Sequence, residues 1–245
     1  MITLDTIHKY FPKEKLTLLG SSDDSRMTGT AIDIARLMSN DGEPVHYFSI
    51  QQKRERFEKW ENKHRRTKDS ILTHPLFTFN DAVLNIDELC NEIEKIDASC
   101  IIIDYIGLVD TPLHVNTRAE ELLEICERLD ELAQKKGKRI IALHLCHHII
   151  QRDYSSQGVR YNQRIEDSLG LNMLLSWPII KDRFILLDCE ENNMYMYKNG
   201  VIEFLLTGQS IELKHLSIRD AKSLIAKIIN DKEKISAEEK LKYQS

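Results

Sequence analysis

One carboxylate stands where metal chemistry would need it, at the end of an apolar run. The segment IIIDYIGLVD, residues 101–110, places Asp104 directly after a run of isoleucines. An aspartate at the carboxyl edge of a parallel sheet can hold a hydrated Mg²⁺. Apolar strands that end in aspartate are also common without such a role, so this segment alone does not establish a metal site.

A second cluster combines imidazole and thiol groups, which are zinc ligands. His144, Cys146, His147 and His148 stand close together in the sequence. A tetrahedral zinc site needs matching ligands elsewhere at a paired spacing, and the sequence offers none. We therefore favour a strand-end or loop role for this cluster, and no local Cys/His/Asp arrangement makes Cys146 a nucleophile.

Residues 149–164, IIQRDYSSQGVRYNQR, bring basic and aromatic residues together in an expected loop. Arginine neutralises phosphate and tyrosine stacks on bases, so the composition fits contact with single-stranded DNA. An exposed polar loop with incidental basic residues fits it equally well. The candidate DNA-binding residues are Arg152, Tyr154, Arg160, Tyr161 and Arg164.

The stretch 51–68, QQKRERFEKWENKHRRTK, is also basic, but glutamates are interspersed in it at helical spacing. Such a pattern favours a solvated helix face over a nucleic-acid patch. Phe57 and Trp60, three residues apart, are expected to pack inward.

The elements that must position these residues alternate between strand and helix. Short apolar runs predict buried parallel strands at 15–20, 45–50, 99–104 and 139–146. Amphipathic patterns predict helices at roughly 28–40, 51–64, 86–96 and 117–136. This alternation predicts right-handed βαβ units, and so an α/β fold whose parallel sheet is covered by helices on both faces.

After about residue 165 the pattern changes. Segments 182–189, 193–198 and 201–206 are strand-like and are joined too tightly for crossover helices. Antiparallel hairpins are expected there, with a turn at Lys198-Asn199-Gly200. From Ser217 to about Lys234 an amphipathic pattern predicts a terminal helix, followed by a charged tail.

The composition narrows the class of protein. With 245 residues, 42% hydrophobic and 30% charged, the chain suits one large globular α/β domain with an appended segment. A net charge of -5 gives no bulk attraction to DNA, so nucleic-acid binding must be local. Five scattered cysteines favour reduced thiols. The sequence also lacks a membrane-length apolar run and a signal-peptide core, so we expect a cytoplasmic protein without a membrane partner.

Several segments match a known family in their order along the chain. They are LTLLG with the polar loop after it, VHYFSI, IIIDYIGLV, EELLEICERLDELAQKKGKRIIALHL, RIEDSLGLNMLLSW and YKNGVIEFLLTGQ. In this order they resemble the RecA-like ATPase domain of DnaB-type replicative helicases and their phage counterparts. The resemblance implies a RecA-like domain over 14–213, preceded by a linker segment at 1–13 and followed by a C-terminal amphipathic helix and tail at 214–245. It implies Mg·ATP as the cofactor, and single-stranded DNA or a replication or helicase-ring protein as the partner.

The resemblance places the phosphate loop after Gly20, where a working loop reads GxxxxGK[ST]. This chain has GSSDDSRMT instead. Aligned on Gly20, Ser25 takes the place of the glycine, Arg26 that of the lysine, and Met27 that of the hydroxyl that binds Mg²⁺. Thr28 would restore the hydroxyl only if the loop shifted by one residue.

Other positions depart from the family pattern as well. Asp23 and Asp24 bring negative charge into a loop that should cradle phosphate. Gln51 stands where the family has the glutamate that activates water, and an amide is a poor general base. Leu145 stands where the resemblance implies a phosphate-sensing glutamine, and Lys198 where it implies an arginine finger. The positions that correspond to catalytic residues are therefore Gln51, Asp104 and Lys198, with Asp104 also the magnesium position.

Taken together, these substitutions argue against rapid hydrolysis, because losing one electrostatic stabiliser typically costs on the order of 10² to 10³ in rate. The leading hypothesis is a non-hydrolysing helicase-like protein in DNA replication, recombination or mobile-element biology, which binds single-stranded DNA or a replication protein. One alternative is an active ATP-dependent translocase in which Arg26, Thr28 and Asp104 still hold Mg·ATP. Another is a structural protein that joins or blocks a hexameric ring. The absence of the family's amino-terminal domain favours an accessory role.

Overall fold

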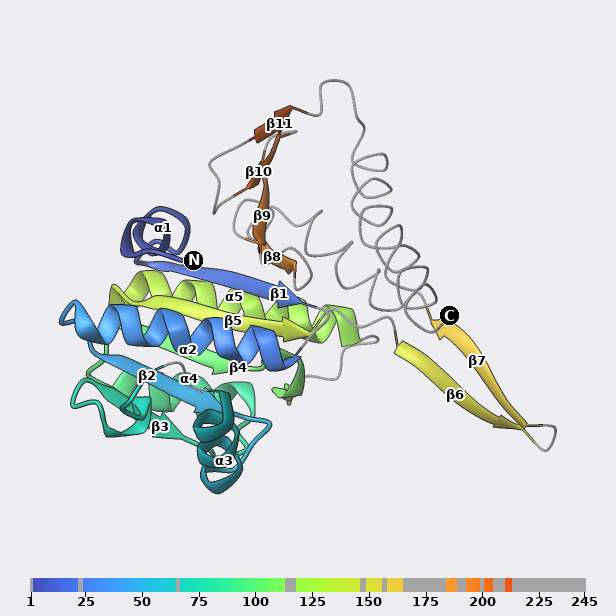
Figure 1. Ribbon diagram of the computed structural model, residues 1–245. Helices are drawn as coiled ribbons and strands as arrows, with labels where there is room; N and C mark the ends of the chain where they lie inside the picture. The colour runs from blue at the N-terminus through green and yellow to red at the C-terminus, as the bar shows by residue number, and fades with distance from the viewer. Residues whose placement is uncertain are drawn as a thin grey trace, which may run out of the picture.

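The computed structural model describes most of the first 145 residues and several strands after them (Figure 1). The described residues are 2–21, 24–64, 67–112, 118–145, 149–155, 158–164, 184–188, 193–198, 201–204 and 210–212. The predicted terminal helix, and with it the segment 214–245, lies outside the described residues.

A parallel sheet forms the centre of the domain. Its strands are β1 (Lys15–Ser21), β2 (Val45–Ser49), β3 (Phe77–Asn80), β4 (Cys100–Asp104), β5 (Arg139–Leu145) and β8 (Phe184–Asp188), in the order β8-β1-β5-β4-β2-β3. The strands β2 and β4 are buried along their whole length, as their mainly apolar sequences predict. The short strand β3 was not predicted. It joins the edge of the sheet by pairing Phe77 with Val45.

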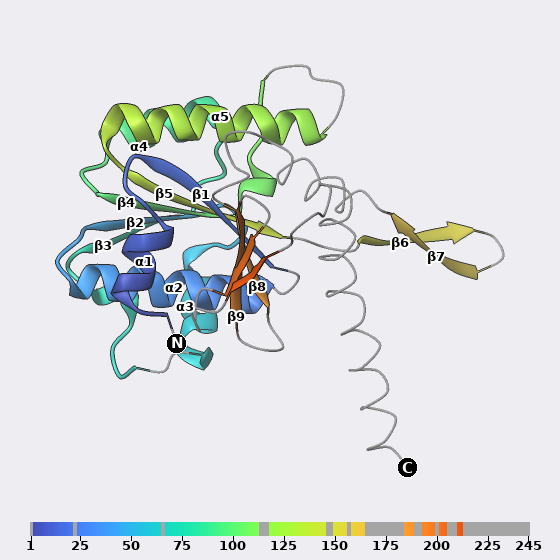
Figure 2. The ribbon, with the colours of Figure 1, turned by 90° about the horizontal axis from the view of Figure 1, so that it is seen from above.

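Helices cover both faces of this sheet, as Figure 2 shows from above. One apolar core lies between the sheet and the helices α2 (Asp24–Asn40) and α3 (Arg54–His64). The other lies between the sheet and the helices α4 (Ile86–Lys95) and α5 (Arg118–Lys136). Two short 3₁₀ turns, η1 (Ile71–Thr73) and η2 (Ile106–Leu108), complete this part of the chain. The predicted α/β architecture with helices on both faces is therefore confirmed.

Helix α4 illustrates how local sequence sets these elements. Its apolar residues Ile86, Leu89 and Ile93 recur at spacings of three and four, and all are buried. Asn85 caps the helix by accepting a hydrogen bond from the backbone N–H of Glu88, whose side chain accepts one from the backbone N–H of Asn85. The backbone N–H of Ile86 also donates to the carbonyl of Asp110, which ties the start of α4 to the segment after β4.

The first residues of the chain pack into the same core. Helix α1 (Leu4–Tyr10) begins after the capping residue Thr3, and its Ile7 and the following Phe11 are fully buried. Arg139, at the start of β5, is itself buried and donates a hydrogen bond to the carbonyl of Phe11. Its guanidinium also pairs with Glu43 at 3.2 Å. The segment 1–13, which the resemblance implied to be a linker, is thus bound to the sheet through apolar burial and through one arginine.

Antiparallel strands follow β8 and extend the sheet. They are β9 (Asn193–Lys198), β10 (Val201–Phe204) and β11 (Ser210–Glu212). Ile185 pairs with Met196 between β8 and β9, and Val201 pairs with Lys198 between β9 and β10. The predicted antiparallel hairpins are confirmed, with a further short strand, β11, at their edge.

The segment 149–164 is a hairpin, not the loop that we expected. Strands β6 (Ile149–Ser155) and β7 (Gly158–Arg164) pair along their full length and form a sheet of their own. Figures 1 and 2 both show this hairpin projecting away from the central sheet. Serine and glycine, which suggested a loop, stand where the two strands turn back. Among the helices that the structure describes, none is long and apolar enough to cross a membrane.

Candidate active site at the carboxyl edge of the sheet

The carboxyl ends of the central strands bring the predicted site residues to one edge of the sheet. Gly20 in β1 pairs with His144 in β5, and Ser49 in β2 pairs with Asp104 in β4. Beyond β2, the backbone N–H groups of Ile50 and Gln51 both point at the carbonyl oxygen of Asp104, at 2.7 Å and 3.4 Å. Ligands of open α/β sheets bind at this kind of edge.

Asp104 is nearly fully buried, and two protein hydroxyls donate to the same oxygen of its carboxylate. Thr28 Oγ1 lies 3.0 Å from Asp104 Oδ2, and the Tyr47 hydroxyl lies 2.5 Å from it. Thr28 comes from α2, Tyr47 from β2 and Asp104 from β4. Charge-assisted hydrogen bonds of this kind are the strong ones in proteins. The carboxylate is therefore fixed in place from two sides by the chain itself.

Tyr47 is the site residue that the sequence did not reveal. Its side chain is fully buried, and its ring stacks on Phe79 with centroids 5.9 Å apart and also packs on Phe57 at 5.4 Å. Burial raises the pKa of Tyr47 well above its ordinary value, and the charge and hydrogen bond of Asp104 raise it further. The signal in the sequence was a phenol within a buried strand, since a buried hydroxyl normally has a partner.

The start of α2 places Met27 and Thr28 differently with respect to Asp104. Strand β1 ends at Ser21 and α2 begins at Asp24. Met27, placed at the magnesium hydroxyl by alignment on Gly20, is fully buried in the apolar core instead. The hydroxyl that faces Asp104 belongs to Thr28, the residue that would supply it only if the loop were shifted by one position.

The other loop positions are only partly described. The backbones of Ser25 and Arg26 lie in the first turn of α2, and their side chains lie outside the described part of the structure. Asp23 lies outside the described residues altogether.

Gln51 lies next to Asp104 through its backbone and keeps a half-buried side chain. The Gln52 side-chain amide lies 3.5 Å from the Gln51 amide oxygen, at the limit of a hydrogen bond. Ser49 closes the turn by donating to the carbonyl of Gln52 at 2.7 Å. The structure thus places Gln51 at the edge where the resemblance implies a water-activating base, and the group found there is an amide.

Three further predicted positions belong to other parts of the edge or to strand ends. His144 is buried in β5, whereas Cys146 and the two histidines after it lie outside the described residues. Leu145 ends β5 opposite Ser21, and Lys198 ends β9 opposite Val201. The side chains of Leu145 and Lys198 are not among those described.

The candidate DNA-binding residues all lie in the β6–β7 hairpin. Arg152 pairs with Tyr161, and Tyr154 pairs with Val159. Arg160 pairs with Asp153, and Arg164 with Ile149. The pairing therefore gathers all five on one short ribbon, which projects away from the central sheet in Figures 1 and 2.

The donor set around Asp104 fits a hydrated Mg²⁺ only in part. A threonine hydroxyl and a carboxylate are oxygen ligands of the type that Mg²⁺ prefers, and Thr28 and Asp104 supply both. The tyrosine hydroxyl is an additional donor on Oδ2, so it takes up part of the acceptor capacity of that oxygen, whereas neither hydroxyl donates to Oδ1, which is buried. The amide of Gln51 cannot act as the general base that activates water for hydrolysis.

Comparison with known proteins supports the fold. No family description matches this sequence, and no curated protein matches it. Among solved structures, the chain is similar to a DnaB-like replicative helicase studied for its interactions with primase, with a TM-score of 0.52 and 12% identity over 79% of this chain and 52% of that one. It also matches a second solved structure, described as an ATPase domain, with a TM-score of 0.49 and 14% identity over 78% of this chain and 76% of that one. The chain has the RecA-like fold of DnaB-type helicases, and it spans about half the length of the DnaB-like helicase.

Proposed function

We propose that this helicase-fold protein does not turn over ATP at an enzymatic rate, and that it acts in DNA replication, recombination or mobile-element biology by binding single-stranded DNA or a replication protein. The observation that carries the proposal is the hydrogen-bonded set of Tyr47 and Asp104, in which a buried phenol donates to the carboxylate. This set stands beside an amide at Gln51.

Hydrolysis needs a group that takes a proton from water and a metal that neutralises the phosphates. The Gln51 amide cannot serve as a general base near neutral pH. A magnesium ion that binds Oδ2 of Asp104 would have to compete with the Tyr47 hydroxyl for that oxygen. Hydrogen bonds to charged groups contribute about 1.5–3 kcal/mol each, so displacing one would weaken metal binding by a comparable amount.

The binding role is supported by the hairpin. Its projecting ribbon carries Arg152, Arg160 and Arg164 together with Tyr154 and Tyr161. Basic and aromatic residues on one extended element suit a single strand, because the arginines neutralise phosphates and the rings accept bases.

One observation favours a second function, an ATP-dependent DNA translocase with a shifted phosphate loop. The contact of 3.0 Å between Thr28 and Asp104 preserves the hydroxyl and carboxylate pair that holds magnesium in working ATPases.

An ATPase assay with and without single-stranded DNA separates the two functions. We expect negligible turnover in both conditions. Turnover of about 1 s⁻¹ or more lies within the ordinary enzyme range. If such turnover is observed and is abolished by Asp104→Ala, the protein is an enzyme and the proposal is wrong. A nucleotide titration with and without Mg²⁺ then shows whether ATP binds at all.

A further inference from the structure

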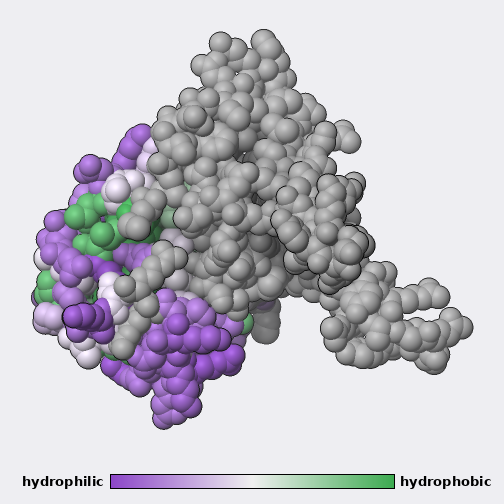
Figure 3. Space-filling model, viewed as in Figure 1, coloured by the Kyte–Doolittle hydropathy of each residue, from purple (hydrophilic) through white to green (hydrophobic). Residues whose placement is uncertain are grey.

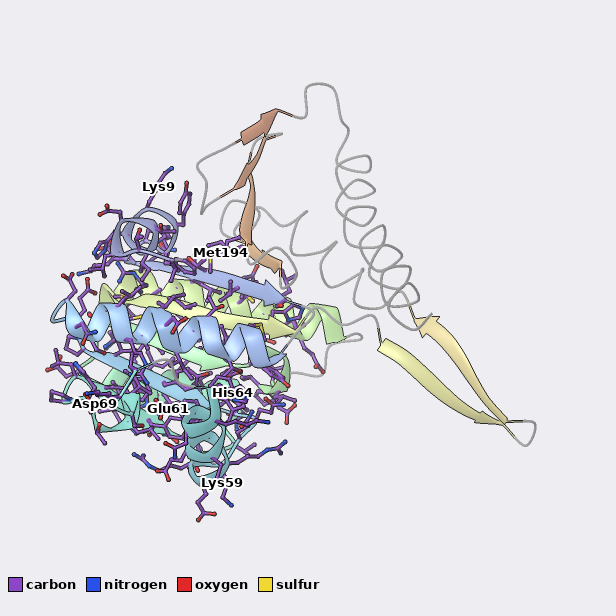
Figure 4. The ribbon with its side chains drawn as sticks, viewed as in Figure 1. Lys9, Lys59, Glu61, His64, Asp69 and Met194 are labelled. Carbon is purple, nitrogen blue, oxygen red and sulfur yellow. The ribbon has the colours of Figure 1, made fainter. Side chains whose placement is uncertain are left out.

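The outer surface of α3 carries three cations that form no ion pair with any described residue, beside one exposed carboxylate, that of Glu55 four residues before Lys59. Arg56, Lys59 and Lys63 are all exposed and recur at spacings of three and four, so they share one side of the helix. We call these three residues the α3 stripe. In Figure 3 the surface over α3 is hydrophilic, and in Figure 4 Lys59 points away from the domain.

The sequence favoured a solvated face with balanced charge because glutamates are interspersed in this helix. One of these glutamates, Glu61, does not offset the exposed cations of the helix. Glu61 is buried and accepts hydrogen bonds from Arg36 of α2, from the Ser70 hydroxyl and, at 2.8 Å, from the backbone N–H of Ile71. Figure 4 shows Glu61 on the side toward α2. Its charge is therefore neutralised inside the domain and does not offset the α3 stripe.

The α3 stripe differs from other basic side chains on the surface. Lys95 pairs with Glu92 at 2.8 Å, while Lys135 and Lys136 pair with Glu94 at 2.9 Å and 3.7 Å. Within α3 itself, Arg54 pairs with Glu58 at 3.4 Å. Within the described part of the chain, the side chains of the α3 stripe form no ion pair or hydrogen bond. In a protein of net charge -5, this side of α3 thus carries, among the described residues, three unpaired cations against the single carboxylate of Glu55.

Aromatic rings stand beside this charge. Trp60 is half-buried, and its indole stacks on the exposed His64 imidazole with centroids 4.9 Å apart. On the other side Trp60 lies against α2, where a methyl group at Gly29 would be 3.7 Å from the indole. The stacked pair of Trp60 and His64 is therefore held by α2 on one side and is partly open to solvent on the other. Trp60 directly follows Lys59 in the helix.

We infer that the α3 stripe, with Trp60 and His64 at its edge, binds the phosphate backbone of single-stranded nucleic acid. Unpaired cations favour a polyanion, and aromatic rings beside them favour a strand with free bases over a duplex. The inference rests on the proposed binding of single-stranded DNA. It adds a second surface, separate in sequence and structure from the β6–β7 hairpin.

The test measures binding of a fluorescent oligothymidylate by the whole chain over a range of salt concentrations. The slope of the logarithm of the binding constant against the logarithm of the salt concentration changes by about -0.7 for each phosphate contact on a single strand. The three residues of the α3 stripe should therefore account for about -2 of this slope. The variant Arg56→Gln/Lys59→Gln/Lys63→Gln should lose that part of the slope. The matched control Lys95→Gln/Lys135→Gln/Lys136→Gln removes the same charge from paired positions and should keep it. Far-UV circular dichroism checks that both variants fold.

A second readout locates the strand. The chain has two tryptophans, so a Trp177→Phe background leaves Trp60 as the only indole. Its emission should be quenched by oligothymidylate, and the quenching should disappear in the α3 stripe variant. Equal slope losses in the stripe variant and the control would show a bulk charge effect and overturn the inference. Binding to polyglutamate but not to oligothymidylate would assign the face to an acidic protein and overturn it too.

The same titration keeps the two proposals apart. If the slope is lost only when Arg152, Arg160 and Arg164 become alanine, the hairpin binds the strand and the inference about α3 is wrong. If it is lost only in the α3 stripe variant, the inference holds and the role of the hairpin is wrong. If the wild-type chain does not bind oligothymidylate, the inference is wrong, while the proposed lack of hydrolysis is judged by the ATPase assay alone.

Discussion

The phenolic hydroxyl of Tyr47 donates a hydrogen bond to Oδ2 of Asp104 across 2.5 Å, at the point where β2 and β4 end side by side. The two residues lie 57 positions apart in the chain, so only the sheet brings them together. Because Thr28 donates to the same oxygen, the carboxylate is already hydrogen-bonded before a ligand arrives. Predictions about metal and nucleotide binding follow from this arrangement.

Replacing Tyr47 by phenylalanine keeps the ring packing and removes the hydroxyl. The free energy of unfolding should fall by about 2 kcal/mol, because a buried carboxylate loses a hydrogen bond. Added Mg²⁺ should then stabilise Tyr47→Phe more than the wild type, since a ligand that binds only the folded state raises its stability. Urea unfolding with and without MgCl₂ measures both effects.

The control for this prediction is a double-mutant cycle with Asp104→Asn. In that background Tyr47→Phe should cost less stability, and Mg²⁺ should have little effect. An equal response to Mg²⁺ in the wild type and in Tyr47→Phe would contradict the view that the hydroxyl competes with the metal.

Met27→Thr would restore a magnesium hydroxyl according to the sequence alignment, but the structure predicts a different outcome. Met27 is fully buried, so its loss should cost about 2–4 kcal/mol of stability through a cavity in the core. It should not improve ATP affinity, because Thr28 already faces Asp104. Thermal unfolding and a nucleotide titration check the two parts.

Asp23→Ser with Asp24→Ser should improve ATP affinity more than Met27→Thr does. The two carboxylates repel phosphate by their like charge, whatever the metal geometry. The affinities of the two variants are compared in the same titration. Micromolar affinity for ATP in the unmodified chain would show that this repulsion is unimportant.

Removing the arginines of the β6–β7 hairpin should weaken binding to single-stranded DNA. Three phosphate contacts are lost when Arg152, Arg160 and Arg164 are changed to alanine. The slope of the logarithm of the binding constant against the logarithm of the salt concentration should therefore become less negative by about 2. Fluorescence anisotropy with an oligothymidylate over a salt series measures the slope. The control Lys95→Gln/Lys135→Gln/Lys136→Gln should leave it unchanged, and an unchanged slope in the arginine variant would exclude the hairpin.

His46 should make the domain less stable in mild acid. Burial lowers its pKa from 6.5 to about 4, and its Nδ1 shares a hydrogen bond with Thr78 Oγ1 at 2.7 Å. Between these two pKa values the unfolded chain binds a proton that the folded chain does not. Stability therefore rises with pH across this window, and is lost as the pH falls from 6.5 to 4, by up to about 3 kcal/mol.

The measurement is urea unfolding across that pH window. His46→Asn, which can keep the contact to Thr78, should flatten the pH dependence. His64→Gln, a change at an exposed histidine, serves as the control and should retain it. If both variants keep the wild-type slope, other groups control the acid sensitivity.

The central strands were predictable because continuous apolar runs are typical of strands buried on both faces. This pattern placed Asp104 at the carboxyl edge of the sheet, and the family resemblance placed Gln51 at a catalytic position. Strand β3 escaped prediction because FTFN is short and joins the sheet only through β2. The hairpin at 149–164 escaped it because serine and glycine mark both loops and tight turns.

The details of the candidate site could not be predicted, because they depend on packing between distant segments. Whether Met27 or Thr28 faces Asp104 is decided by which side of α2 rests on the core. The bond between Tyr47 and Asp104 depends on the register of β2 against β4. The neutralisation of Glu61 by Arg36 likewise depends on how α2 packs against α3. Counting the charges in the sequence of α3 alone therefore overestimates the negative charge on its surface.

Arg139 in β5 links the first helix to the sheet, and this link affects how the domain unfolds. Peeling α1 away would take the Phe11 carbonyl from a guanidinium that is almost wholly buried, and a buried cation that loses a partner is costly. Fraying at chain ends normally needs little free energy. Here we instead expect the first helix to open only with global unfolding, so that the beginning of the chain and β5 form one cooperative unit.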